Sequence, residues 1–403
     1  MRYKHILSVS QFEDPFLVRF FREVQMMKNL SKSDEGKMLL RKTLEGTLTG
    51  LIFWPSSSRT FHSFFSATEC LGGSVGIERG IRRESGGKVV WELPFSSETK
   101  GEYFEDSIRA FASSYKDTLV IRHFEEGAVL RAANILDKFG YNTHVINAGD
   151  GPGEHPTQAL LDLWSILEHF GYDIERDKQK LQRLHIAFVG DNKAGRTVHS
   201  LAPLLGKFFG MDITFISPPE FCYPANKEAE LKQAGVRYQF RDQFVKADIY
   251  YVTRLNITDY LSKKDEKRRR ELEKLVPRYA VTRRVVEEND VKLVLHPFPR
   301  REELPIWLPN EPSTWDESVD RMPQAGYFAQ MENGKFVRMA LLKLVMVPYL
   351  DLRDMHRGRW GESFYRQCAS CGRVDSTIFG WSEKALPRKF FLPKVICPLC
   401  FPQ

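Results

Sequence analysis

Strand-like and helix-like segments alternate along the chain up to about residue 360, and this alternation constrains the fold more than any other feature. Short apolar runs indicate buried strands, whereas the amphipathic runs between them indicate helices. This order is typical of parallel sheets covered by helices. The expected strands are 47–54, 72–79, 118–123 and 143–149 in the first half, and 184–191, 212–219, 247–254 and 291–298 in the second. The clearest expected helices are 100–115, 127–140 and 155–171.

These two groups of strands predict an α/β protein with two doubly wound parallel-sheet domains, joined near residues 150–175. A length of 403 residues leaves room for both domains and a small appendage. The expected units are a first domain at 1–154 that is completed by a C-terminal helix at about 334–352, a second domain at 155–333, and a small domain at 363–403.

The composition is that of a globular protein, with 42% hydrophobic and 28% charged residues. A formal charge of +7 suits anionic substrates as well as nucleic acid. The basic run at 263–270 also contains acidic residues and is interpreted as a solvated helix face, so a nucleic-acid partner is not expected. Because no apolar run has membrane-spanning length and the N-terminus lacks a signal-peptide pattern, we expect no membrane contact and a cytoplasmic location.

A hydroxyl-rich turn follows the first apolar run. The sequence LTGLIFWP leads into SSSRT, and FHSFFSATECLGG continues with helical spacing. Ser57, Ser58, Arg59 and Thr60 therefore lie where a strand ends and a helix begins, and such a turn binds anions, phosphate above all. A plain helix N-cap with one surface arginine is the alternative.

Other polar residues also follow expected strands. Arg122 and His123 come after TLVI, Asp191 after IAFVG, Arg254 after IYYVT and His296 after VKLVL. Ligands of open α/β sheets bind at the carboxyl ends of the strands. We therefore expect these side chains to face one crevice.

Four of the six cysteines crowd the last 36 residues as C-A-S-C and C-P-L-C, with 25 residues between the pairs. Two C-x₂-C pairs are a strong signal for a structural zinc site, because four thiolates close a tetrahedron and leave no open position for catalysis. Disulfides are the poorer interpretation for a cytoplasmic protein. We predict one structural zinc per chain in a small β ribbon, held by Cys368, Cys371, Cys397 and Cys400.

Seven motifs together resemble the catalytic chains of aspartate transcarbamoylases. In order they are SSRT at 57–60, RH at 122–123, NAGDGPGEHPTQALLDL, VGDNKAGRTVHSL, VTRLN, LHPFPR and FAQMENGKFVRMALL. The resemblance runs from KHILSV near the start to about Val345. It implies transfer of the carbamoyl group of carbamoyl phosphate to L-aspartate in pyrimidine biosynthesis, without an organic cofactor. It also assigns the first domain to carbamoyl phosphate and the second to aspartate.

The resemblance carries roles onto matching residues. The phosphate would be held by the serines of the turn together with Arg59 and Thr60, which form charge-assisted contacts. Thr60, Arg122 and His155 would polarise the carbonyl group, and Gln158 would read the carbamoyl NH₂. Arg196 and Arg254 would bind the carboxylates of aspartate, and the backbone carbonyls of Pro297 and Phe298 would accept from its amine. Phe298-Pro299 is expected to be a cis peptide, as in the family.

The same resemblance implies a homotrimer with shared active sites, and trimers that could pair. The segment FSSETKGEYFEDS resembles the mobile loop that reaches a neighbouring subunit, and Ser96 and Lys100 match its substrate contacts; Lys100 would then act in catalysis. The cysteine tail is similar to the zinc domain of separate regulatory chains, here fused to the catalytic chain.

The chain departs from the family pattern at four positions. Pro55 stands where a glutamate is usual, Phe61 where an arginine follows the turn, and Asn256 where a glutamine is usual. Asp259 lies near the place of an arginine that pairs with the missing glutamate. These changes put the charge-paired latch between domains, and any cooperativity, in question.

Two other functions stay open at this stage. One is a carbamoyltransferase for another amino acid, although ornithine-type relatives carry H-C-L-P where this chain has His296-Pro297-Phe298-Pro299. The other is a weakly active protein whose zinc ribbon binds a regulatory partner or nucleic acid.

Overall fold

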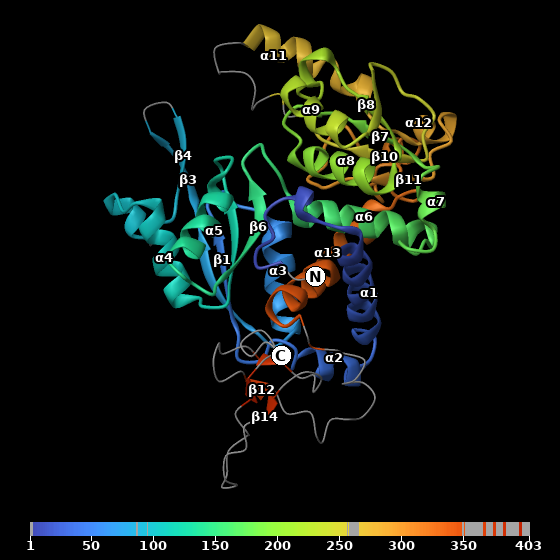
Figure 1. Ribbon diagram of the computed structural model, residues 1–403. Helices are drawn as coiled ribbons and strands as arrows, with labels where there is room; N and C mark the ends of the chain where they lie inside the picture. Colours follow the sequence, from blue (N-terminus) through green and yellow to red (C-terminus); the bar gives the residue numbers. More distant parts are fainter. Residues whose placement is uncertain are drawn as a thin grey trace.

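The computed structural model describes residues 3–85, 88–94, 96–255, 257, 266–348 and 350, and four two-residue strands in the C-terminal tail. Two parallel sheets dominate it, one in each half of the chain (Figure 1). The first has the order β2-β1-β5-β6 and the second the order β11-β10-β7-β8-β9. Their strands are β1 Leu48–Phe53, β2 Ser74–Arg79, β5 Thr118–His123, β6 His144–Asp150, β7 His185–Val189, β8 Asp212–Ile216, β9 Arg237–Arg241, β10 Ile249–Val252 and β11 Leu293–Leu295.

Both expected sheets are thus confirmed, and the alternation of side chains explains why each is covered on two faces. Leu51 and Phe53 of β1 belong to one apolar cluster, whereas Ile52 between them belongs to another. Successive strand residues point to opposite faces, so a fully apolar strand needs helices on both sides. The helices that precede and surround the first sheet are α1 Asp14–Leu30, α2 Asp34–Leu40, α3 Ser58–Cys70, α4 Phe104–Ser114 and α5 Ala128–Lys138.

The second sheet shows the same alternation, with Phe188 and Val189 of β7 in different clusters. The next elements are the helices of the second domain and short 3₁₀ turns from both halves of the chain. The helices are α7 Lys178–Leu181, α8 Arg196–Phe209, α9 Ala225–Gln233, α11 Glu266–Glu273 and α12 Arg283–Glu288. The 3₁₀ turns are η1 Val9–Gln11, η2 Ser97–Lys100, η3 Pro219–Phe221, η4 Val276–Tyr279 and η5 Pro312–Thr314.

Two long helices, α6 Pro156–Phe170 and α13 Tyr327–Met346, connect the halves of the molecule. Helix α6 contacts β6 of the first sheet and α8 of the second domain, and it is buried along most of its length. Helix α13 returns to pack on α1, α3 and α6 (Figure 1). It begins at Tyr327 and ends at Met346, whereas the sequence placed it at about 334–352; Pro348 disfavours helical backbone at Val347 and stops it early.

The structure also contains strands that the sequence analysis did not predict. An antiparallel hairpin of β3 (Ile81–Ser85) and β4 (Lys88–Glu92) extends from the first domain (Figure 1). Strand β9 at the edge of the second sheet was not predicted either. In the tail, where a small β ribbon was expected, β12 (Arg366–Gln367) pairs with β13 (Val374–Asp375), and β14 (Ser382–Glu383) pairs with β15 (Val395–Ile396). Among the described helices, none is both long and apolar enough to cross a membrane.

Candidate active site

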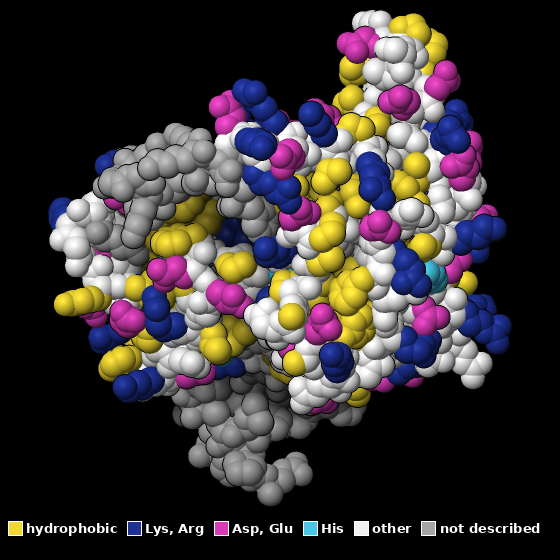
Figure 2. Space-filling model, turned by 90° about the horizontal axis from the view of Figure 1, so that it is seen from above, with side chains coloured by type: hydrophobic (Ala, Val, Ile, Leu, Met, Phe, Trp, Pro, Cys, Tyr) yellow, Lys and Arg dark blue, Asp and Glu magenta, His cyan; other side chains and the backbone are white. Residues whose placement is uncertain are grey.

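A cavity of about 700 Å³ lies where the carboxyl ends of the two sheets face each other. Viewed from above, the surface is hollowed between the two halves, and basic and acidic side chains are intermixed over this face (Figure 2). Eleven of the predicted site residues line the cavity: Ser57, Ser58, Arg59, Thr60, Arg122, His155, Gln158, Arg196, Arg254, Pro297 and Phe298. The expectation that strand-end residues meet in one crevice is confirmed for Arg122, Asp191, Arg254 and His296, whereas His123 packs against Trp54 and does not line the cavity.

The hydroxyl-rich turn forms the start of α3. Ser57 is the N-cap residue, yet its side chain makes no capping hydrogen bond. Backbone N–H groups in the first turn of a helix have no partner within the helix and present a partial positive charge. Because the serine hydroxyl is not used for capping, the geometry favours the anion-binding interpretation of this turn over the plain N-cap.

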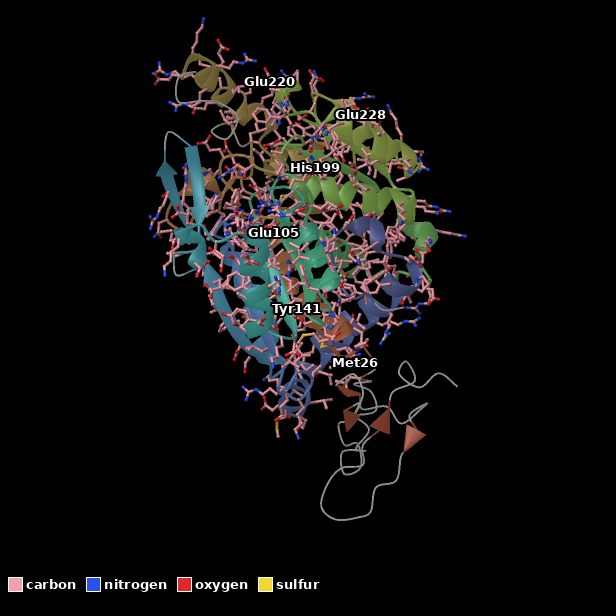
Figure 3. All side chains as sticks on the ribbon, turned by 60° about the vertical axis from the view of Figure 1, so that its left-hand side comes forward. Met26, Glu105, Tyr141, His199, Glu220 and Glu228 are labelled. Atoms are coloured by element: carbon pink, nitrogen blue, oxygen red, sulfur yellow. The ribbon has the colours of Figure 1, made fainter. Side chains whose placement is uncertain are left out.

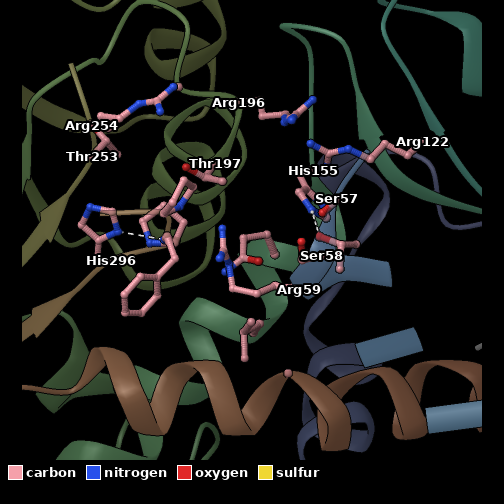
Figure 4. A pocket seen from close by; sticks show the side chains of 18 of the residues that line it. Ser57, Ser58, Arg59, Arg122, His155, Arg196, Thr197, Thr253, Arg254 and His296 are labelled. Atoms are coloured by element: carbon pink, nitrogen blue, oxygen red, sulfur yellow. Dashed lines mark hydrogen bonds between the residues drawn. The ribbon is translucent and has the colours of Figure 1, made fainter. Parts of the chain in front are cut away.

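Arginine guanidinium groups dominate the charge of the cavity (Figure 4). Burial, with the positive charges of Arg196 and Arg59 nearby, lowers the pKa of Arg122 well below its usual value. Burial also lowers the pKa of Arg196 to about 10. The Nε atom of Arg122 has no hydrogen-bond partner among the described residues. Like charges this crowded are stabilised by an anion between them.

A glycine of the NAGDG motif makes room for the first of these arginines. Nη1 of Arg122 donates to the carbonyl oxygen of Ala148 at 3.1 Å. The next residue, Gly149, has a φ of 125°, and a Cβ atom there would lie 2.8 Å from that same Nη1. Glycine tolerates this backbone and leaves the space that the guanidinium needs.

His155 lies at the N-terminus of α6, deep in the cavity. Burial, with the charges of Arg122, Arg196 and Arg338, lowers the pKa of His155 well below its usual value, so its imidazole is neutral at pH 7. Its Nε2 lies 3.4 Å from Oγ1 of Thr60, and its Nδ1 lies 3.3 Å from Oγ1 of Thr157.

The connection that carries His155 is itself fixed from the second domain. Ser200 of α8 accepts from the backbone N–H of His155 at 2.8 Å. His199, labelled in Figure 3, lies between two loops, with ring nitrogens 3.1 Å from the carbonyl oxygens of Pro152 and Asn192. The start of α6 is thereby tied to the loop after β7.

The loop after β11 forms the opposite wall. The Phe298-Pro299 peptide is cis, as predicted, and Phe298 has a φ of 53°. His296 shapes the loop, since its Nδ1 accepts from the N–H of Phe298 at 2.8 Å and its Nε2 contacts Glu303 at 3.0 Å. The Arg59 guanidinium lies 5.6 Å from the centre of the Phe298 ring, so the two walls touch through a cation–π contact.

Arg338 and Gln330 are among the lining residues that the sequence analysis did not assign, whereas His296 lines the cavity as expected. Arg338 and Gln330 both lie on α13, within the quoted motif FAQMENGKFVRMALL. Arg338 is 1% exposed, and burial lowers its pKa to about 10 although the Asp162 carboxylate opposes this. The sequence signal that could have identified Gln330 and Arg338 was the regular helical spacing of polar residues within this motif.

Ser96 and Lys100 do not line the cavity of their own chain. Lys100 is exposed at the end of η2. Of the departures from the family pattern, Phe61 lies under the guanidinium of Arg79, 4.6 Å from it. Asn256 and Asp259 lie outside the described residues, as do the four predicted zinc ligands. Among the residues that the structure does describe, no group of His, Cys, Asp or Glu could hold a metal ion.

The fold and the cavity define a class of two-domain α/β proteins with an anion-binding cleft between two parallel sheets, and comparison with known proteins identifies the family. Residues 4–168 match the family model "Aspartate/ornithine carbamoyltransferase, carbamoyl-P binding domain", and residues 182–345 match the "Asp/Orn binding domain" of the same family. The chain belongs to the aspartate/ornithine carbamoyltransferase family. The tail after residue 345 lies outside both models.

Curated relatives are similar over most of their length. The chloroplastic aspartate carbamoyltransferase of Oryza sativa is 34% identical over 353 residues, covering 86% of each chain. The aspartate carbamoyltransferase catalytic subunit of Aliivibrio salmonicida is 36% identical over 347 residues, covering 85% of this chain and 96% of the relative.

Solved structures agree with this family. The catalytic subunit of M. jannaschii aspartate transcarbamoylase is 31% identical, with a TM-score of 0.68 over 89% of this chain and all of that one. Aspartate transcarbamoylase from Trypanosoma cruzi, in complex with carbamoyl phosphate and aspartate, is 29% identical with a TM-score of 0.67, over 85% of this chain and 97% of that one.

Proposed function

We propose that this chain is an aspartate carbamoyltransferase. It transfers the carbamoyl group of carbamoyl phosphate to the amine of L-aspartate and yields N-carbamoyl-L-aspartate and phosphate, in pyrimidine biosynthesis. The observation that carries this proposal is the single cavity in which the anion-binding turn and Arg122 face Arg196 and Arg254. The aspartate carbamoyltransferases among its relatives support the choice of substrates.

We call the side of the cavity formed by the turn at Ser57–Thr60, Arg122 and His155 the first wall. It binds and polarises carbamoyl phosphate. Its phosphate lies over the N-terminus of α3 and contacts Ser57, Ser58 and Arg59, where N–H groups and a guanidinium favour a dianion. Thr60, Arg122 and His155 surround the carbonyl oxygen. The hydroxyl of Thr157 donates to Nδ1 of His155, so the single proton of the neutral ring is on Nε2. The Nε2–H then donates to the carbonyl oxygen, and such donors contribute about 10²–10³ in rate each.

The opposite side, formed by Arg196, Arg254 and the loop of Pro297 and Phe298, is the second wall. It binds aspartate and orients its amine. Arg196 and Arg254 provide guanidinium forks for the two carboxylates. The backbone carbonyl groups of Pro297 and Phe298 accept from the amine and direct its lone pair at the carbonyl carbon. As the amine attacks, a C–N bond forms and negative charge grows on the oxygen held by the first wall. The C–O bond to phosphate then breaks, and the departing phosphate takes the proton that the new nitrogen substituent loses.

A direct assay tests this function. Purified chain, carbamoyl phosphate and either L-aspartate or L-ornithine are incubated, and the carbamoylated products are measured. We expect N-carbamoyl-L-aspartate alone. Turnover of ornithine instead of aspartate would move the chain to the other branch of the family, and no turnover of either would overturn the proposal.

We further propose that three chains share their active sites, with Ser96 and Lys100 entering the cavity of a neighbouring subunit. What supports this is their placement away from the cavity of their own chain, on an exposed segment between β4 and α4. Lys100 would then meet the phosphate and carboxylates bound next door.

For the tail we propose one structural zinc, bound by Cys368, Cys371, Cys397 and Cys400, and a cytoplasmic location in which the thiols stay reduced. Strand β12 ends one residue before the first cysteine pair and β15 ends one residue before the second, and these two strands contact each other. Their contact supports a common site for the two pairs.

A further inference from the structure

One buried carboxylate beneath the cavity joins three segments that are distant in sequence. Asp162 lies one helical turn after Gln158 on α6 and has no exposed surface. Its Oδ1 accepts from Nε2 of Gln158 at 2.7 Å and from Nε2 of Gln330 at 2.6 Å. Its Oδ2 accepts from the hydroxyl of Tyr251 on β10 at 2.8 Å.

The charge on Asp162 decides the direction of these hydrogen bonds. Burial raises its pKa to about 6, against the lowering effects of its three hydrogen bonds and of the Arg338 guanidinium. The carboxyl group is therefore ionised at pH 7. An ionised carboxylate only accepts hydrogen bonds, so both glutamines must turn their NH₂ groups toward it.

The orientation of each glutamine then determines what its other end can do. The carbonyl Oε1 of Gln330 accepts from the backbone N–H of His296 at 2.9 Å and so anchors the loop of Pro297 and Phe298. Gln158 lines the cavity, and with its NH₂ held by Asp162, its Oε1 is the end available to a ligand. A carbonyl oxygen accepts hydrogen bonds and cannot donate them.

We propose that Asp162 is a positioning residue that fixes the Gln158 amide as a hydrogen-bond acceptor, and that this orientation selects an acyl phosphate carrying an NH₂ group over one carrying a methyl group. The inference rests on the proposed function, because it names how that same site recognises its first substrate. Acetyl phosphate has the shape of carbamoyl phosphate but leaves Oε1 of Gln158 without a donor. A site built around such a contact rejects the analogue that lacks it.

The test compares two acyl phosphates at saturating aspartate. The KM for carbamoyl phosphate and the inhibition constant of acetyl phosphate are measured for the wild-type chain and for Asp162→Asn. The amide of an asparagine can donate to Oε1 of Gln158, which allows the glutamine to turn its NH₂ to the cavity. We expect the KM for carbamoyl phosphate to rise about 10–100-fold while the acetyl phosphate constant changes less than about threefold. An unchanged ratio of the two constants in a folded variant overturns the inference.

Two controls separate positioning from general destabilisation. Glu23→Gln neutralises a half-buried carboxylate that contacts α13, through Lys343 at 2.6 Å, and should leave the ratio unchanged. In a Gln158→Ala background, adding Asp162→Asn should change the ratio little, because the group through which Asp162 acts is gone.

If the Asp162→Asn chain folds poorly, the variant Gln158→Ala tests the inference instead. Gln158→Ala alone must then abolish the preference for carbamoyl over acetyl phosphate, and a preserved preference overturns the inference. The wild-type assay is read first. A wild-type chain without carbamoyl transfer refutes the proposed function, whereas an active wild type with an unaffected ratio refutes only the role of Asp162.

Discussion

The two walls of the cavity differ in how tightly the protein holds their working groups. On the first wall the three groups that surround the carbonyl oxygen, Thr60, Arg122 and His155, are buried, whereas Ser58 and Arg59 of the anion-binding turn are exposed. On the second wall Arg254 and Phe298 are only half-buried. A prearranged wall suits the polarisation of a carbonyl group, since its donors need no reorganisation when charge develops. A more open wall suits the entry of a second substrate and the release of product.

The largest expected effect comes from removing charge on the first wall. Arg122→Ala and Arg59→Ala should each lower kcat by about 10²–10³, because each removes a charged donor that acts on the reacting group. Steady-state rates with both substrates saturating are the measurement. Arg22→Ala, at an exposed arginine paired with Glu175, is the matched control. Near-normal kcat in either cavity variant would mean that the first wall is not where the chemistry occurs.

Exchange between subunits tests whether a neighbouring chain adds Lys100 to the two walls of each cavity. Lys100→Ala and Arg122→Ala chains should each be nearly inactive alone. If each site takes Arg122 from one chain and Lys100 from the next, an equal mixture that is unfolded and reassembled should recover roughly a quarter of the wild-type sites. No recovery from a mixture proven to exchange subunits would exclude shared sites.

A substitution on the second wall should change the KM for aspartate and not the KM for carbamoyl phosphate. Arg254→Ala should raise the KM for aspartate by about 10–100-fold and leave the KM for carbamoyl phosphate within about threefold, because one carboxylate loses its fork. Initial rates over a matrix of both substrates give the two constants. Equal changes in both would show that the walls do not divide the substrates as proposed.

The zinc tail should affect the α/β domains least. Cys397→Ser should abolish bound zinc, about one per chain in the wild type, and unfold the tail, since the metal supplies most of the stability of so small a unit. The two main domains have their own cores, so their thermal midpoint should change little. We also expect weaker oligomers after zinc chelation. Fresh wild-type protein that contains no zinc would end this prediction.

The sequence predicted the first wall well because its groups lie in short motifs at the ends of apolar strands. The turn at Ser57–Thr60 and the position of Arg122 after TLVI can be interpreted without any distant contact. Asp162 escaped notice because an acidic residue in HPTQALLDL has no evident task until Gln330 and Tyr251 approach it from segments that are 168 and 89 residues away.

The β3–β4 hairpin and the start of α13 were missed for related reasons. Its strands, IRRES and KVVWE, have only five residues each and neither alternates apolar and polar residues, so the signal is weak beside the strong apolar runs of the central sheet. Helix α13 contains Gly334 and polar residues in its first half, which lie against α6 and the cavity, and this obscured its true beginning at Tyr327.

The return of α13 to the first domain has a consequence for the order in which the chain acquires its structure during synthesis. The segments that form the second sheet, from β7 to β11, leave the ribosome in succession and can pair as soon as β11 is made. The N-terminal sheet is made earlier, yet α3 and α1 stay uncovered on the face that α13 later occupies. Contacts between residues so far apart form slowly, and exposed apolar faces attract other chains. The half of the protein that is translated first therefore buries the face of α1 and α3 only after α13, near the other end of the described chain, has been made.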